Sequence, residues 1–140
     1  MKYGPAGERN RFVFLDTGVL IAHLRDWPGS RFLLQSFAES HNLAVSVVSV
    51  VEVWQGAKSS EHDRTQVFFD SLNVIGLDYE LSRLSGNLAC DLRSKGFAIS
   101  LADAVIGSTA LRSGAPVLTA NTKHFKLIPN LEVWDFRERL

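Results

Sequence analysis

Three acidic residues of this sequence, Asp16, Glu52 and Asp103, have positions that suit metal-assisted chemistry. Asp16 directly follows the apolar run 12–15, and each of the other two is the fourth residue of a segment that begins with serine. Carboxylates that lie together repel one another, and a divalent cation that neutralises them makes such a cluster tolerable. Oxygen ligands select hard cations, so Mg²⁺ or Mn²⁺ is expected at these residues and zinc is not.

Other common catalytic chemistries lack their residue patterns. The sequence contains no phosphate-binding loop, no dinucleotide-binding glycine fingerprint and no serine-nucleophile elbow. An aspartyl-phosphate enzyme could use Asp16 as its nucleophile, but such enzymes usually carry a second acid two residues later, where this chain has Gly18. The histidines lack the paired spacing that a zinc site requires, and they are scattered along the chain as His23, His41, His62 and His124.

A simpler account treats each acid as an independent helix cap. Aspartate is a favoured residue just before a helix, and a carboxylate in the first turn also interacts favourably with the helix dipole. These effects stabilise a helix by about 0.5 to 2 kcal/mol and require no contact between the acids. For any one of the three residues this account explains the sequence at least as well as catalysis does, so the residues alone leave both accounts open.

The elements that would carry these acids alternate between strands and helices. Phe12–Leu15 is too short and too uniformly apolar for an amphipathic helix, and it is typical of a central parallel strand that is buried on both faces. Further short strands are expected at 44–48, 74–77, 116–119 and 131–134. Helical patterns are found at 19–24, 30–39, 49–57, 67–72, 78–95 and 100–113, and 121–125 is expected to be a polar turn.

The topology of such a chain would bring the acids together. Segments 49–52 and 100–103 resemble capping boxes, which would put Glu52 and Asp103 in the first turns of helices. In a parallel sheet with right-handed crossovers, the ends of strands and the starts of the following helices share one edge, so both are expected to meet Asp16 there. The pattern predicts one α/β domain over residues 12–140, with a central parallel sheet of four or five strands flanked by helices. A mobile N-terminal leader is expected over residues 1–11.

The composition fits one well-cored domain without an evident charged partner. Of the 140 residues, 46% are hydrophobic and 21% are charged, which is enough apolar material for one core. The formal net charge is zero, so no overall excess of charge indicates a nucleic acid or a membrane. The lone cysteine, Cys90, cannot form a disulfide within the chain, and no secretory or membrane-spanning run is present, so a cytoplasmic location is expected.

Four segments carry a family resemblance when they are taken in order. They are 12–21, 46–57, 100–111 and 117–125, which read FVFLDTGVLI, SVVSVVEVWQGA, SLADAVIGSTAL and VLTANTKHF. Together they resemble the motifs of PIN-domain ribonucleases of the VapC toxin type, over nearly the whole chain. The resemblance implies a PIN-like three-layer sandwich, Mg²⁺ or Mn²⁺ dependence and hydrolysis of RNA phosphodiester bonds. It also implies homodimerisation and neutralisation by a cognate antitoxin whose tail enters the active site.

The resemblance assigns roles to residues by position. Asp16, Glu52 and Asp103 match the metal-binding acids of the family, and Asn121 is added to them as a catalytic residue that orients a water or a carboxylate. The chain departs from the family at the fourth acid, because Asn121 stands where many members have Asp and His124 stands where others have Asp or Glu. The departure leaves open whether the site binds one metal ion or two. It also leaves an alternative function open, that of a catalytically weak PIN-like domain that binds RNA or a protein partner.

Overall fold

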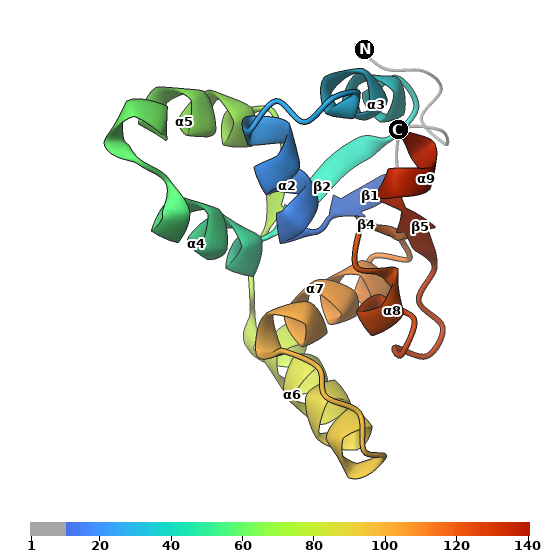
Figure 1. Cartoon of the computed structure of the whole chain (residues 1–140). Coiled ribbons are helices and arrows are strands. Elements are labelled where there is room, and N and C mark those ends of the chain that lie inside the picture. The colour runs from blue at the N-terminus through green and yellow to red at the C-terminus, as the bar shows by residue number, and fades with distance from the viewer. Residues whose placement is uncertain (1–10) are drawn as a thin grey trace.

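The chain folds around a five-stranded parallel sheet in which the first strand is central (Figure 1). The computed structural model describes residues 11–140, so the leader expected over residues 1–11 lies, apart from Arg11, outside the described residues. The strands stand in the order β3-β2-β1-β4-β5, and neighbouring strands are parallel throughout. Their bounds are β1 Phe12–Leu15, β2 Asn42–Ser46, β3 Asn73–Ile75, β4 Val117–Thr119 and β5 Val133–Asp135.

Helices cover both faces of the sheet, which confirms the expected three-layer α/β architecture (Figure 1). The helices of one face are α2 Thr17–Leu24, α3 Ser30–Ala38, α5 His62–Asp70 and α9 Phe136–Arg139. Those of the other face are α6 Tyr79–Ser94, α7 Leu101–Arg112 and α8 Thr122–Phe125. Helix α4 Val47–Gly56 packs against both cores, and the 3-10 turn η1 Ser59–Glu61 joins it to α5. No helix within residues 11–140 is both long enough and apolar enough to cross a membrane.

The side chains of β1 alternate between the two cores, which explains why this strand is apolar throughout. Val13 and Leu15 belong to the core on the side of α2, α3 and α5, whereas Phe14 belongs to the core on the side of α6, α7 and α8. All three are fully buried. A strand that is covered on both faces offers no place for a polar side chain until it leaves the sheet, and β1 leaves it at Asp16.

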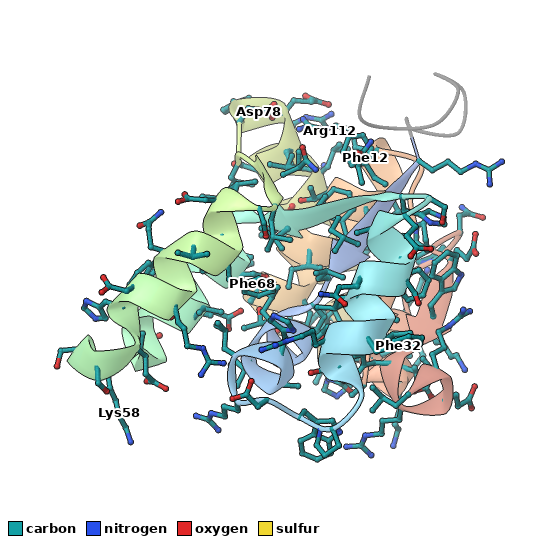
Figure 2. The ribbon with its side chains drawn as sticks, turned by 90° about the horizontal axis from the view of Figure 1, so that it is seen from above. Phe12, Phe32, Lys58, Phe68, Asp78 and Arg112 are labelled. Atoms are coloured by element: carbon teal, nitrogen blue, oxygen red, sulfur yellow. The ribbon has the colours of Figure 1, made fainter. Side chains whose placement is uncertain are left out.

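Helices α6 and α7 pack side by side, with α7 against the sheet and α6 extending away from it (Figure 1). At their outer surface, Nη1 of Arg112 in the last turn of α7 donates to both carboxylate oxygens of Asp78, at 2.9 Å each. Asp78 is the N-cap of α6, and Figure 2 shows the two side chains next to each other. This contact ties the end of α7 to the start of α6 and so helps to position α7, whose first turn carries Asp103.

Several element boundaries differ from the sequence prediction for local reasons. Strand β2 ends at Ser46, because the hydroxyl of this residue accepts a 3.2 Å hydrogen bond from the backbone N–H of Val48 and caps α4. Ser49 is therefore a buried residue inside the helix and not its cap. Helix α3 begins after Gly29, whose φ of 83° is in the left-handed region that glycine adopts without strain. The expected polar turn at 121–125 contains a single helical turn, α8.

Candidate metal centre

The carboxyl ends of β1 and β4 lie side by side at the point where the chain changes direction across the sheet. After β1 the chain runs outward through β2 and β3, and it then returns to the other side of β1 through β4. In open α/β sheets, ligands bind in the crevice outside the carboxyl ends of the strands at such a switch point. The backbone N–H of Asp16 donates to the carbonyl of Leu118 at 3.1 Å, which holds the two strand ends together at this place.

Asp16 caps a helix and also lies at this edge of the sheet, beside the end of β4. Its Oδ1 accepts a hydrogen bond from the backbone N–H of Gly18 at 3.2 Å, as the N-cap of α2, and its Oδ2 accepts one from the hydroxyl of Thr119. The residue is buried, with 8% of its surface exposed. Burial raises the pKa of Asp16, the two hydrogen bonds lower it, and the charges of Asp103 and Glu52 raise it. The capping account is therefore correct for Asp16, and it does not exclude the metal account.

Glu52 reaches the same edge of the sheet from the middle of α4 and not from its first turn. The first-turn prediction is wrong because α4 begins at Val47, after its cap Ser46. Glu52 Oε1 accepts a 2.7 Å hydrogen bond from the hydroxyl of Thr17, and the hydroxyl oxygens of Thr17 and Ser49 are 2.9 Å apart. Thr17 is the residue that follows the acid of β1, so this contact ties Glu52 to the end of that strand.

Asp103 lies in the first turn of α7, as the sequence predicts. The hydroxyl of Ser100 accepts a 3.0 Å hydrogen bond from the backbone N–H of Asp103, which confirms Ser100 as the N-cap. Burial raises the pKa of Asp103, the neighbouring Ser100 and His124 lower it, and the charge of Glu52 raises it. Glu52 therefore raises the pKa of both aspartates, and the three acids lie within electrostatic range of one another.

Two further polar side chains come to the same edge from the region of α8. The backbone N–H of Asn121, the residue before this helix, donates to Oγ1 of Thr119 at 2.8 Å. The side-chain nitrogen of Asn121 lies 2.8 Å from Nδ1 of His124, and that ring nitrogen lies 3.6 Å from Oδ2 of Asp103. Contacts through Thr119, Asn121 and His124 thus connect Asp16, the residue after β1, with Asp103 of α7.

The donor groups at this edge suit a hard divalent cation. They are three carboxylates with the hydroxyls of Thr17 and Thr119 beside them, and oxygen atoms of this kind are the ligands that Mg²⁺ and Mn²⁺ prefer. In the part of the chain that the structure describes, no three His, Cys, Asp or Glu side chains already form a group arranged to hold a metal. The acids are coupled through their charges. A bound cation would offset both their mutual repulsion and the cost of burying charged carboxylates, the two effects that raise the pKa of Asp16 and Asp103.

The sequence identifies the acids more readily than the hydroxyl groups that hold them. Sequence reasoning assigns Ser49 to a helix cap and Thr119 to the end of a strand. In the structure the hydroxyl of Ser49 contacts Thr17, and the hydroxyl of Thr119 donates to Asp16. One signal for Thr119 is present in the sequence, because it is the only polar residue of β4 and stands at its last position. Asp16 stands immediately after the last residue of β1, so the two polar residues emerge from neighbouring strands at one edge.

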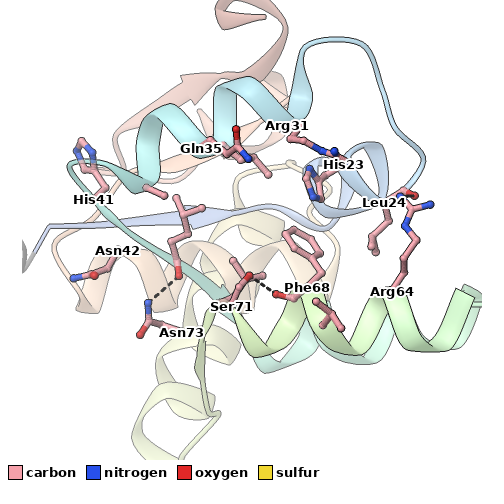
Figure 3. Close-up of a pocket in the computed structure, with 15 residues that line it drawn as sticks. His23, Leu24, Arg31, Gln35, His41, Asn42, Arg64, Phe68, Ser71 and Asn73 are labelled. Atoms are coloured by element: carbon pink, nitrogen blue, oxygen red, sulfur yellow. Dashed lines mark hydrogen bonds between the residues drawn. The ribbon is translucent and has the colours of Figure 1, made fainter. Parts of the chain in front are cut away.

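A separate hollow of about 520 Å³ opens between α3 and α5 (Figure 3). Its lining combines apolar side chains, among them Leu34 and Phe68, with the two cations Arg31 and Arg64. The three acids are not among the residues that line this hollow. The chain therefore presents an acidic edge at the ends of the strands and, elsewhere, a partly apolar groove with positive charge.

Comparison with known proteins indicates one family. The model of the PIN domain matches residues 13–131 of the chain. The chain is 31% identical over 129 residues to ribonuclease VapC2 of Rickettsia felis, in an alignment that covers 86% of this chain and 96% of the relative. It is 29% identical over 119 residues to ribonuclease VapC19 of Mycobacterium tuberculosis, with 84% of this chain and 95% of the relative covered.

Solved structures have a similar fold over nearly the whole chain. The crystal structure of VapBC2 from Rickettsia felis, bound to a DNA fragment from its promoter, contains a chain that matches with a TM-score of 0.80 and 25% identity, covering 89% of this chain and 98% of that one. A toxin–antitoxin complex from Klebsiella pneumoniae matches with a TM-score of 0.71 and 27% identity, covering 85% of this chain and 94% of the other. The likeness therefore extends over most of the chain and is not limited to one motif.

Proposed function

The chain belongs to the PIN-domain family and to its VapC type, and on this premise we propose that it is an endoribonuclease, the toxin of a toxin–antitoxin pair, that hydrolyses RNA phosphodiester bonds. Its two named relatives are ribonucleases. The observation that carries the proposal is the meeting of Asp16, Glu52 and Asp103 at one edge of the sheet. Independent helix caps need not lie near one another, whereas Glu52 accepts from Thr17, the neighbour of Asp16 in the chain. Contacts through Thr119, Asn121 and His124 also lead from Asp16 to Asp103.

Mg²⁺ or Mn²⁺ is the proposed cofactor, held by Asp16, Glu52 and Asp103. When bound, the cation would stabilise charge on the phosphoryl oxygens and lower the pKa of a water molecule. The chain itself supplies the orientation of the ligands, because Thr119 donates to Asp16 and Thr17 donates to Glu52. Carboxylates that are fixed in this way lose less freedom when they bind a cation than free side chains would.

A water molecule is the proposed nucleophile, and Asp103 is the proposed residue that positions it. Asp103 is partly exposed whereas Asp16 is buried, so Asp103 has the better access to solvent water. In the proposed step the water oxygen bonds to phosphorus, one water proton passes to Asp103, the bond from phosphorus to the leaving oxygen breaks, and the leaving oxygen takes a proton from solvent. Asp103 then returns its proton to solvent. Asn121 contributes by engaging His124, which lies against Asp103.

The proposed substrate is single-stranded or looped RNA, because such segments expose backbone and bases that a duplex keeps inside its grooves. Lys123 of α8 and Lys126, which follows this helix, are exposed near Asn121 and His124 and supply positive charge for phosphate groups. The formal net charge of the chain is zero, so this local pair and not the overall charge would attract the RNA.

A cognate antitoxin is the proposed protein partner, since the matching structures from Rickettsia felis and Klebsiella pneumoniae are of toxin–antitoxin pairs. The groove between α3 and α5 offers it a surface, with Phe68 as an apolar contact and Arg31 and Arg64 as cations (Figure 3). Val67, at the rim of this groove, is 69% exposed. An amphipathic helix with acidic residues fits this combination of groups, and the tail beyond it is proposed to enter the metal centre.

A cytoplasmic homodimer completes the proposal. Phe97 and Leu101, near the end of the α6 and α7 pair, are 44% and 68% exposed, and a second copy of the chain would cover them. Sedimentation velocity measures this directly, and a species of twice the chain mass is expected. Cys90 is an exposed free thiol with no second cysteine in the chain, which suits a reducing compartment.

Cleavage of a labelled, loop-containing RNA by the purified protein tests the proposed activity. Fragments are expected with Mg²⁺ or Mn²⁺, none in chelator, and activity should return when the cation is restored. A circular RNA distinguishes the mode of attack, because only an internal cut can linearise it. RNA that stays intact with both cations would refute the nuclease proposal. RNA that is bound but not cut would establish the alternative, a catalytically weak binding domain, which the missing fourth acid at Asn121 and His124 favours.

A further inference from the structure

His124 faces the acids of the metal centre from the place where a fourth carboxylate is missing. Its Nδ1 lies 3.6 Å from Oδ2 of Asp103 and 2.8 Å from the side-chain nitrogen of Asn121. The ring is held near this position by α8, because the next residue, Phe125, is fully buried in the core. The backbone N–H of Asn121, at the start of the same turn, is bound to Thr119 on β4.

Nδ1 of His124 is within hydrogen-bond distance of only one of these two neighbours. If Nδ1 is unprotonated, it accepts from the amide nitrogen of Asn121, and if it carries the proton, it donates to the amide oxygen once that side chain is turned over. Neither arrangement uses Oδ2 of Asp103 as a hydrogen-bond partner, because its 3.6 Å distance from Nδ1 exceeds the length of a hydrogen bond, roughly 2.7 to 3.2 Å.

A cation could bind between Nδ1 of His124 and Oδ2 of Asp103 with little movement of either group. Ligand atoms about 2.1 Å from an octahedral cation and at right angles to each other are about 3.0 Å apart. Nδ1 of His124 and Oδ2 of Asp103 would need to approach by only ~0.6 Å to reach that separation. The side chain of His124 is 47% exposed, so it has room to move, and the exposed amide of Asn121 can rotate away from the ring.

Resting on the function proposed for this same edge, we propose that Nδ1 of His124 is a ligand of the divalent cation beside Oδ2 of Asp103. The centre of this chain then has a mixed set of nitrogen and oxygen donors instead of carboxylates alone. Imidazole nitrogen is a good ligand for first-row transition metals, whereas Mg²⁺ takes oxygen ligands almost exclusively. The presence of His124 where related chains have an acid therefore shifts the preference of the site from Mg²⁺ toward Mn²⁺.

Electron spin echo spectroscopy of the protein loaded with Mn²⁺ detects the proposed bond directly, because a coordinated imidazole nitrogen modulates the echo. The modulation is expected in the wild-type protein and in His62→Gln, a control that alters a different histidine at the start of α5. It should disappear in His124→Gln and in His124→Asp. Calorimetry should show at least about a tenfold loss of Mn²⁺ affinity in His124→Gln, the lower end of the losses seen when residues that support a metal site are removed. In His124→Asp the ratio of Mn²⁺ to Mg²⁺ affinity should fall by a similar factor.

The outcomes separate this inference from the proposed function. Bound Mn²⁺ without nitrogen modulation, no Mn²⁺ binding at all, or an unchanged affinity ratio in His124→Asp would each overturn the assignment of His124. A nitrogen-coupled Mn²⁺ in a protein that cleaves no RNA would uphold this assignment and refute the nuclease. Cleavage that depends on Mn²⁺ without nitrogen coupling would uphold the nuclease and refute the assignment of His124.

Discussion

Replacement of Asp103 by Asn distinguishes a shared metal centre from a set of unconnected caps. Asparagine keeps the size and hydrogen-bonding capacity of the side chain and removes its charge. In the metal-free protein, burial and the charge of Glu52 raise the pKa of Asp103, which means that the folded state disfavours the ionised carboxylate. The Asp103→Asn protein should therefore melt in chelator at a temperature equal to or above that of the wild type.

With metal, the wild type should instead melt at a higher temperature than Asp103→Asn, and by a larger margin. A cation present at 100 times its dissociation constant stabilises the folded state by about 2.7 kcal/mol. An unfolding entropy of about 2.1 cal/mol/K per residue, over 140 residues, converts this energy to a rise in Tm of about 9 °C for the wild type. If Asp103→Asn binds the cation about a hundredfold more weakly, it gains about 0.4 kcal/mol and its Tm rises by about 1 °C. Differential scanning fluorimetry of both proteins, with metal and with chelator, measures the four values.

Asp63→Asn is the matched control, because Asp63 lies in the first turn of α5 as Asp103 lies in the first turn of α7. It should lose only the interaction with the helix dipole, melt about 1 to 3 °C below the wild type, and keep the full shift with metal. The reasoning would be refuted for Asp103 if its variant behaved in the same way as this control.

Three further predictions follow from the contacts. Thr119→Val removes the hydroxyl that donates to Asp16, which should destabilise the protein by about 1 to 3 kcal/mol in urea unfolding, whereas Thr119→Ser should stay close to the wild type. Because burial raises the pKa of Asp103 above 3.8, this carboxyl binds its proton more tightly in the metal-free fold than in the unfolded chain, so the stability that it contributes is lost as the pH rises through the raised value; the urea midpoint of the wild type should therefore fall relative to that of Asp103→Asn over this range, and the same pH dependence in both proteins would contradict this. Val67→Asp should weaken binding of the co-purified antitoxin at least about tenfold in surface plasmon resonance, and an unchanged affinity would place the partner elsewhere.

The strands at the site could be predicted from sequence because burial on both faces leaves a strong local pattern. The apolar run of β1 ends at a carboxylate, and this order alone places Asp16 at the edge of a sheet. The start of α4 could not be fixed in the same way. Ser46 and Ser49 are both able to cap a helix, and the two valines between them suit a strand equally well. Tertiary packing decides in favour of Ser46, which moves Glu52 from the first turn into the middle of the helix.

Contacts between distant segments account for the rest of what the sequence leaves undetermined. The hydrogen bond from Thr119 to Asp16 joins residues 103 positions apart, and nothing in the local pattern of either segment predicts it. The contact of His124 with Asp103 likewise depends on how α8 packs against α7. Sequence reasoning therefore identifies which residues carry charge at the edge, whereas the groups that orient them emerge only from the fold.

Single-turnover cleavage of RNA by Glu52→Gln is the most direct test of the claim that these acids form one catalytic metal centre. Glutamine can still accept the hydrogen bond from Thr17, so the change removes mainly the negative charge. Glu39→Gln, at the exposed end of α3, is the control for the loss of a charge elsewhere. With saturating RNA and Mn²⁺, the account predicts that the rate falls at least about a hundredfold in Glu52→Gln and is unchanged in Glu39→Gln, because a weakened metal site loses several kcal/mol of transition-state stabilisation. Cleavage by Glu52→Gln at the wild-type rate would contradict the account.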